Sequence, residues 1–403
     1  MNNITETAQQ VISSDGMAQV LTTLIPLLGT QAANTTVAMT TGRVRPSVPP
    51  EYLLQVIFVC DQVLTPLVVC FGIIGNIFSI VVLTRKEMSS PTNCFLKALA
   101  ASDVMLLVVQ IPHFLSYNHR LNDTHSFKIF YRYYTIFRYF ANNTFITCTC
   151  WITVAVTIER FISLRFMMNS RMVCTIRRAR RAILAIFLMS FVFHFSKFFE
   201  YEPNLNLRQP FPVVGTALVH STAYETYVHI ANITLAAIIP VFVLIVVNSF
   251  LIFFLTTHRR RMLKHKTPGS GSTSQVDMMH ISFIVVSMVL VFIICHSVGV
   301  FLALNIAVHG RYKIFANPLF VSMKHVNGLL VFVNSSINFL LYCAISRKFR
   351  TTFASIFLGR LSKKMSWPLQ TSTNEQSMLS KANVTTLYTS QISTTSSKGV
   401  DDL

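Results

Sequence analysis

Hydrophobic residues occur along this chain in long blocks separated by shorter polar stretches. Seven blocks approach or exceed the roughly 20 apolar residues that an α-helix needs to cross a bilayer. They cover residues 55–83, 94–115, 135–164, 182–199, 228–255, 281–308 and 318–345. Gly, Ser, Thr and Pro interrupt the blocks, as is common in membrane spans. The pattern predicts an all-α membrane protein built as a bundle of seven transmembrane helices.

The composition supports a membrane protein and excludes other classes. Of the 403 residues, 52% are hydrophobic and only 12% are charged, and the mean hydropathy is +0.53. Soluble domains contain about 25% charged residues, so a soluble globule, a disordered chain and a collagen are excluded. The net charge of +19 comes from basic residues at the ends of the apolar blocks. No soluble basic domain surrounds them, and we expect no nucleic-acid partner.

Basic residues are concentrated in alternate connections between the blocks. The positive-inside rule places those connections in the cytoplasm, and seven crossings then place the N-terminus outside the cell. Asn-x-Thr sequons at Asn3, Asn34 and Asn122 lie on the predicted outer side, where glycosylation occurs. The predicted cytoplasmic basic residues are Arg85, Lys86, Arg165, Arg171, Arg177, Arg178, Arg180, Arg181, Arg259, Arg260, Arg261, Lys264, Lys266, Arg347, Lys348 and Arg350.

The segments outside the seven-helix domain, residues 52–346, have their own patterns. Residues 1–51 are rich in Thr, Ser, Gln and Asn and predict a disordered extracellular tail. In residues 347–360, four apolar residues recur at i, i+4, i+7 and i+8 before Gly359, which predicts a short amphipathic helix lying on the membrane lipids. These residues are Phe349, Phe353, Ile356 and Phe357. Residues 361–403 are rich in Ser and Thr and predict a disordered cytoplasmic tail.

The sequence gives no support for a disulfide framework, a metal site or a catalytic site. None of the eight cysteines falls in a predicted outer loop, so we expect no disulfide framework. Cys148 and Cys150 are too close together for the usual zinc-binding pair and have no neighbouring His. No set of nucleophile and base is recognisable either, and an enzyme is not expected.

Polar residues inside the blocks are functional candidates, because an ionisable group at the middle of a bilayer costs a few kcal/mol. Asp103 lies near the middle of the second block. Our hypothesis is that polar groups from four blocks converge on its carboxylate and form a buried, hydrated cluster that can hold a sodium ion. The alternative is that each group satisfies a hydrogen bond between helices. The members are Asn76, Asp103, Thr149, Asn334, Ser335 and Asn338.

Five segments, in order along residues 60–350, resemble the signatures of rhodopsin-like G-protein-coupled receptors. They are Gly75-Asn76, Leu99-Ala100-Ala101-Ser102-Asp103, Glu159-Arg160-Phe161, Pro240 and Asn338-Phe339-Leu340-Leu341-Tyr342. The resemblance implies a plasma-membrane receptor that activates a heterotrimeric G protein, with receptor kinases and arrestin acting on its tail. The residues it assigns to coupling and switching are Glu159, Arg160, Asn338, Tyr342 and His296.

A narrower resemblance is to invertebrate FMRFamide-type neuropeptide receptors. It rests on Ser89-Ser90-Pro91-Thr92-Asn93-Cys94, Phe198-Phe199-Glu200-Tyr201-Glu202, Cys295-His296-Ser297-Val298 and Asn334-Ser335-Ser336-Ile337-Asn338-Phe339. It implies an extracellular, amidated FMRFamide-like peptide ligand. A cationic peptide favours carboxylates and aromatic rings at the mouth of the bundle. The ligand-binding candidates are Glu200, Glu202, Glu225, Arg138, Tyr134 and Phe199.

The chain departs from the rhodopsin-like pattern in several places. Thr135 stands near the usual third-helix cysteine, and the loop from Pro203 to Thr226 has no partner cysteine, so we expect a less fixed second outer loop. Val298 and Phe339 replace the usual prolines of the sixth and seventh helices, so we expect these helices to kink less.

Other readings of the same bundle stay open or are disfavoured. A receptor for another ligand class, or a divergent receptor with weak or no G-protein coupling, stays open. A light receptor needs a Schiff-base lysine deep in the seventh helix, whereas Lys324 lies in its outer third. A transporter would show inverted repeats and paired broken helices, which the pattern lacks.

Overall fold

The computed structural model describes residues 50–166, 174–206, 212–221, 233–264 and 273–357, together with residue 359 and isolated positions between 223 and 231. Several predictions lie outside these residues: both tails, the sequons at Asn3 and Asn34, and the ligand-binding candidate Glu225. The third sequon residue, Asn122, ends the short helix α7 (His119–Asn122).

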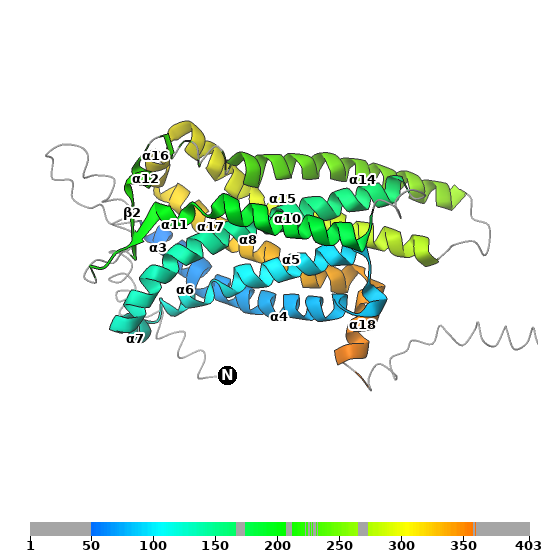
Figure 1. The fold of residues 1–403 in the computed structure, drawn as a ribbon, viewed down its shortest axis with the longest axis horizontal. Coiled ribbons are helices and arrows are strands. Elements are labelled where there is room, and N and C mark those ends of the chain that lie inside the picture. The colour runs from blue at the N-terminus through cyan, green and yellow to red at the C-terminus, as the bar shows by residue number, and fades with distance from the viewer. Residues whose placement is uncertain are drawn as a thin grey trace, which may run out of the picture. The chain divides into compact units, whose positions relative to one another are not determined.

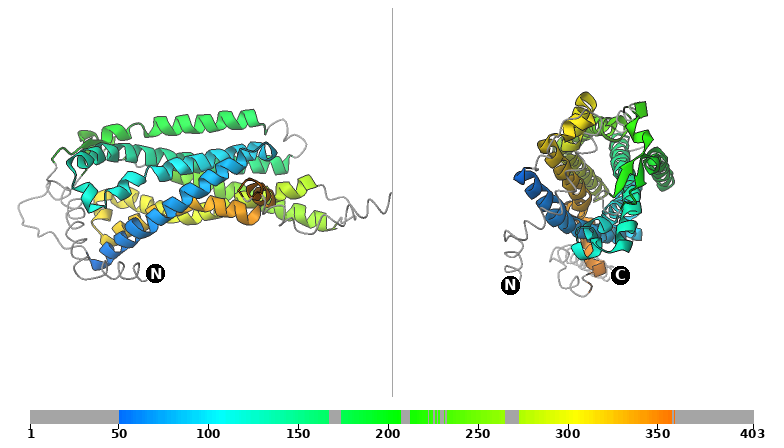
Figure 2. Two further views of the ribbon diagram at one scale, coloured as in Figure 1. Left: turned by 90° about the horizontal axis from the view of Figure 1, so that it is seen from below. Right: turned by 90° about the vertical axis from the view of Figure 1, so that its left-hand side faces the viewer.

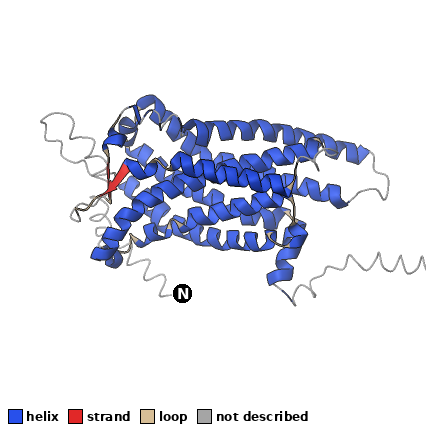
Figure 3. Cartoon of the chain, viewed as in Figure 1, coloured by secondary structure: helices blue, strands red, loops and turns tan. Residues whose placement is uncertain are grey.

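Seven helical segments are long and apolar enough to cross a membrane, which confirms the predicted number (Figures 1 and 3). The first combines α3 (Glu51–Ile57), η1 (Phe58–Leu64) and α4 (Thr65–Leu83), and the second combines α5 (Pro91–Val108) and α6 (Ile111–Leu115). The third is α8 (His125–Arg165), and the fourth combines α10 (Ile176–His194) and α11 (Lys197–Glu200). The fifth to seventh are α14 (Ile239–Lys264), which follows η3 (Ile233–Ile238), then α15 (Thr273–His309) and α17 (Pro318–Ile345).

The remaining elements are short and connect the spans. They are η2 (Lys86–Met88), α12 (Ala217–His220), α16 (Arg311–Phe315), α18 (Arg347–Phe357) and an antiparallel hairpin of β1 (Tyr201–Pro203) and β2 (Val213–Gly215). Seen from one end, the spans stand in a ring (Figure 2). We call the end where α8 ends at Arg165 the basic end, and the end where α3 begins at Glu51 the N-terminal end.

Several predicted spans are longer in the structure than their apolar blocks, the third and fourth among them. The helix α8 begins at His125, ten residues before the predicted start, and α10 begins at Ile176, six residues before it. Helical hydrogen bonding needs no apolar side chains, so each helix continues beyond the apolar block into polar sequence. For α18, the predicted helix is present over Arg347–Phe357, and Gly359 beyond it has a φ of +37°.

Prolines explain the irregular turns within the spans. The π-helix η1 directly precedes Pro66 and η3 precedes Pro240, and the turn between α5 and α6 precedes Pro112. Proline lacks the N–H that an α-helix uses, so the preceding turn changes its hydrogen bonding. In η1 the Thr65 amide and hydroxyl both donate to the carbonyl oxygen of Cys60, the hydroxyl at 2.6 Å. By contrast, α15 and α17 run unbroken past Val298 and Phe339, which keep this N–H.

The first and seventh spans approach closely because two glycines face two side chains of α17. The Ser336 hydroxyl bonds to the carbonyl oxygens of Val68 at 3.0 Å and of Phe332 at 2.7 Å. A Cβ atom added at Gly72 would lie 2.1 Å from this hydroxyl oxygen. At Gly75 a Cβ would lie 3.0 Å from the Cβ of Phe339. The bulk of Phe339, where the rhodopsin-like pattern has proline, therefore fits because Gly75 has no side chain.

We predict that Gly72→Ala destabilises the protein by about 1–3 kcal/mol, the usual cost of overpacking. The new methyl group also meets Leu107 Cδ1 at 2.6 Å, and moving Ser336 would break its bonds to the first span. The measurement is thermal unfolding in detergent. The matched control is Gly328→Ala, where nothing lies within 4 Å of an added Cβ. Equal or higher unfolding temperature for Gly72→Ala would contradict the close packing.

Candidate functional site

The Asp103 carboxylate lies at the centre of a polar cluster between α4, α5, α8 and α17. Asp103 is fully buried. Thr149 Oγ1 donates to its Oδ1 at 3.1 Å, and Asn338 Nδ2 donates to its Oδ2 at 2.9 Å. Thr149 also contacts Ser102 Oγ at 3.3 Å. The predicted convergence of Asp103, Thr149 and Asn338 is therefore present in the structure.

Asn76 joins the first span to the same region. Its Nδ2 donates to the carbonyl oxygens of Gly72 and Ser335, each at 2.8 Å. The Ser335 hydroxyl lies beside the Asp103 carboxylate. Within the described residues, this hydroxyl and Asn76 Oδ1 are buried and make no hydrogen bond of standard geometry. Asn334 is also buried, on the same helix as Ser335. The cluster thus has one carboxylate and two further oxygens with free lone pairs, which is the kind of donor set that hard cations take.

Glu159 and Arg160, near the basic end of α8, form a pair within one helix. Arg160 donates Nε and Nη2 to the two Glu159 carboxylate oxygens, both at 2.8 Å, and both side chains are buried. Thr92 Oγ1 at 2.8 Å and Ser163 Oγ at 3.0 Å donate to the same carboxylate. The arginine is therefore held by its neighbour and does not extend beyond the bundle.

An apolar cluster closes the bundle near this pair. Leu251 and Leu255 of α14 pack with Val286 of α15, and Leu164 of α8 packs against them. The Phe161 ring lies 6.3 Å from that of Phe250 in the same interface. These contacts join the third, fifth and sixth spans at the basic end.

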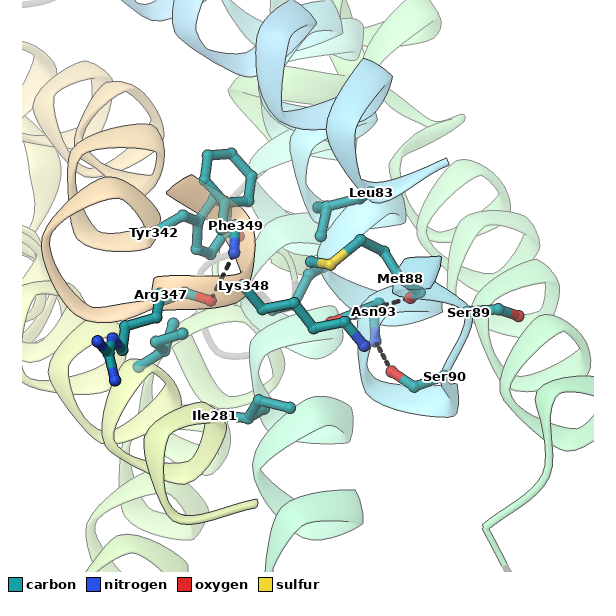
Figure 4. A pocket seen from close by; sticks show the side chains of 13 residues that line it. Leu83, Met88, Ser89, Ser90, Asn93, Ile281, Tyr342, Arg347, Lys348 and Phe349 are labelled. Atoms are coloured by element: carbon teal, nitrogen blue, oxygen red, sulfur yellow. Dashed lines mark hydrogen bonds between the residues drawn. The ribbon is translucent and has the colours of Figure 1, made fainter. Parts of the chain in front are cut away.

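A cavity of about 90 Å³ lies at the basic end beside Tyr342 (Figure 4). It is lined by the turn between α4 and α5, by Ile281 and Ile284 of α15, and by the junction of α17 and α18. The Tyr342 ring packs on Phe349 at 5.4 Å. In the described part of the chain the Tyr342 hydroxyl is buried without a hydrogen-bond partner. It can gain one if these helices move apart. The last switch candidate, His296, stacks on Phe292 at 4.2 Å.

The predicted ligand-binding residues do not form one site. Glu200 is buried, and its Oε1 accepts from Lys197 Nζ at 2.6 Å and from Tyr224 at 3.1 Å. Glu202 is exposed on β1, Phe199 is exposed on α11, and the Tyr134 hydroxyl donates to the Val109 carbonyl oxygen. Arg138 lies in α8, and its buried Nε atom makes no hydrogen bond among the described residues.

The connection between the fourth and fifth spans, which holds the β1–β2 hairpin, is anchored without a disulfide. All eight cysteines are free, which confirms the prediction. Thr135 donates its hydroxyl within α8, to the Tyr131 carbonyl oxygen at 2.7 Å. Arg132, which is buried in the same helix, donates Nη1 to the Asn206 carbonyl oxygen at 3.2 Å. The Tyr201 ring of β1 packs against Tyr139 at 5.2 Å. These noncovalent contacts hold the described hairpin on α8.

Sequence reasoning missed a second ionisable group inside the spans. Asp61 Oδ2 lies 2.7 Å from His325 Nδ1, so the first and seventh spans also meet at an acid–base pair near the N-terminal end. Asp61 is the only acidic residue in the first apolar block. The rule that marked Asp103, that an ionisable residue inside a span is a functional candidate, would have found it.

Residues 63–360 match the family described as serpentine type 7TM GPCR chemoreceptor Srw. The sex peptide receptor-related protein 2 of Caenorhabditis elegans is 25% identical over 78% of this chain and 76% of its own. The sex peptide receptor of Drosophila melanogaster is 25% identical over 78% and 75%, and its FMRFamide receptor is 26% identical over 75% and 54%. Because the family match covers most of the chain and all but the start of the seven-span bundle, this multi-pass membrane protein belongs to the Srw family of G-protein-coupled receptors, within the rhodopsin-like group that its motifs resemble.

Proposed function

We propose that this chain is a plasma-membrane receptor for an extracellular amidated neuropeptide, with a ligand site at the N-terminal end. Its basic end then faces the cytoplasm and activates a heterotrimeric G protein. Curated relatives named for sex peptide, FMRFamide and thyrotropin-releasing hormone support a peptide ligand. The alternate basic connections support the orientation. Receptor kinases and arrestin would act on the Ser and Thr of residues 361–403.

The observation that carries this proposal is the restrained Arg160. Its guanidinium is buried and paired with Glu159 at 2.8 Å, and apolar contacts join α14 and α15 to the same end of α8. A bundle closed in this way represents the resting state of a two-state receptor. A ligand shifts the population only by binding the open state more tightly, and a partner at the basic end is coupled to it reciprocally. In the open state, Arg160 would leave Glu159 and contact the G protein.

The Asp103 cluster fits a sodium ion in the closed state. Asp103 would supply the negative charge, with Asn76 Oδ1 and the Ser335 and Thr149 hydroxyls as neutral oxygen donors. Because these donors come from all four spans of the cluster, an ion among them would stabilise their present arrangement. An ion that favours the closed state must lower the affinity for any ligand that favours the open state.

Wild-type receptor expressed in cultured cells is expected to respond to at least one peptide in a panel of amidated neuropeptides that includes FMRFamide. The readouts are intracellular calcium and cyclic AMP, with untransfected cells as the control. Surface staining establishes that the protein reaches the plasma membrane. A receptor that is present at the surface and silent toward the whole panel would remove the peptide proposal.

Arg160→Ala is expected to reduce signalling to background while surface expression and peptide binding persist. The substitution removes the guanidinium that contacts the G protein, whereas Glu159 keeps its bonds to Thr92 and Ser163. The matched control is Arg165→Ala, at the end of the same helix, where the side chain lies over the rings of Phe166 and Phe254. Normal signalling by Arg160→Ala would exclude the assigned role.

Sodium is expected to lower agonist affinity about fivefold or more when it replaces N-methylglucamine at constant ionic strength. Asp103→Asn should abolish this dependence, because it removes the only charge in the cluster. Thr149→Ala keeps the charge and should weaken the effect. The measurement is competition binding on membranes. The same sodium dependence in Asp103→Asn and wild type would show that the cluster serves packing alone.

A further inference from the structure

Polar side chains from three spans, and one that follows the second span, lie toward the N-terminal end, away from the Asp103 cluster. We call Asp61, His325, Tyr117 and Arg138 the anchor group. Asp61 lies in η1, His325 in α17 and Arg138 in α8, and Tyr117 follows α6. None of the four corresponds to the motifs of the resemblance, and only Arg138 was a ligand-binding candidate from sequence.

Arg138 has a buried guanidinium nitrogen without a partner. The residue is half-buried, and its Nε atom is buried and makes no hydrogen bond among the described residues. Its Cζ lies 5.5 Å from the centre of the Tyr139 ring. A buried charged donor without an acceptor costs free energy that a ligand acceptor can recover. This position therefore favours a ligand with a carbonyl or carboxylate oxygen.

Asp61 offers hydrogen-bond acceptors, whereas Arg138 offers donors. Its Oδ2 lies 2.7 Å from His325 Nδ1, and the two side chains are 20% and 22% exposed. An ionised carboxylate only accepts hydrogen bonds, so Nδ1 must carry the proton and donate. Oδ1 then remains as an acceptor for a ligand N–H group. The π-helical turn of η1, which Pro66 imposes, carries this side chain.

Tyr117 lies within electrostatic reach of both charges. Burial raises the pKa of the Tyr117 phenol, Asp61 and Tyr131 raise it further, and Arg138 opposes them. The phenol thus stays neutral and can donate or accept. His113 bridges two tyrosines, because its Nδ1 lies 2.7 Å from the Tyr131 hydroxyl and its Nε2 lies 3.3 Å from that of Tyr117. These bonds connect α6 with α8 and fix the aromatic wall of the group.

The charges select one kind of ligand terminus. A carboxylate would pair with Arg138 but would be repelled by Asp61. An ammonium group would pair with Asp61 but would be repelled by Arg138. A primary carboxamide is neutral and presents both an acceptor oxygen and N–H donors, so it offers a favourable group to each residue and is repelled by neither. We propose that the anchor group binds the C-terminal carboxamide of the peptide, with Arg138 donating to its oxygen and Asp61 accepting from its nitrogen. This assignment rests on the proposed peptide-receptor function.

The test compares FMRFamide with its free-acid form, or the active peptide of the panel in both forms. Wild-type receptor should prefer the amide by about tenfold or more, the usual effect of losing a hydrogen bond to a charged group. Asp61→Asn removes the repulsion and replaces a charged acceptor with a weaker, neutral one, so the amide should lose potency while the acid gains. Arg138→Gln removes the cation that the acid needs most, so both forms weaken and the acid weakens more. The two variants thus move the ratio of amide to acid potency in opposite directions.

Loss of folded receptor cannot imitate this result, because it lowers both potencies in proportion. Matched controls are Asp123→Asn and Arg120→Gln, which remove exposed charges near α7 and should leave the ratio unchanged. If wild type responds to the amide but Asp61→Asn keeps its ratio, this inference is overturned and the proposed function stands. If surface-expressed wild type responds to no amidated peptide, the proposed function fails, and the inference fails with it.

Discussion

The bilayer offers no water to buried polar groups, so such groups must find partners within the protein. This constraint explains why four of the seven spans meet where they do. The Asp103 carboxylate takes hydrogen bonds from Thr149 and Asn338, and Asn76 bonds to the backbone of the seventh span. Each partner lies on a different helix. The apolar residues around them fit many arrangements, whereas the polar ones accept very few.

The same constraint applies at the basic end. Arg160 and Glu159 satisfy each other, and among the described residues the Tyr342 hydroxyl is buried without a partner. In the proposed two-state receptor, opening would free both groups for new partners, and it would also separate the apolar contact of Leu251, Leu255 and Val286. A ligand or partner would move such an equilibrium only through its different affinities for the two states.

The rhodopsin-like pattern uses a disulfide and a seventh-helix proline, and this chain has other contacts in their places. The hairpin of the second outer loop lacks a disulfide and is held by Arg132 and by the packing of Tyr201 on Tyr139. The seventh span lacks its proline, and Phe339 packs into the space left by Gly75. At the N-terminal end, the Asp61–His325 pair joins the first span to the seventh. These differences change which side-chain contacts hold the spans together, and the order of the seven spans is kept.

The sequence by itself determined the seven spans and the family motifs, because length, hydropathy and spacing are local properties of the chain. It also predicted the partners of Asp103, since an acid inside a span needs them. Tertiary structure alone decided that Tyr224 bonds to Glu200, that the buried Nε of Arg138 has no partner among the described residues, and that Asp61 meets His325. Such pairings depend on how helices far apart in sequence rotate against one another. No spacing along a single helix records that rotation.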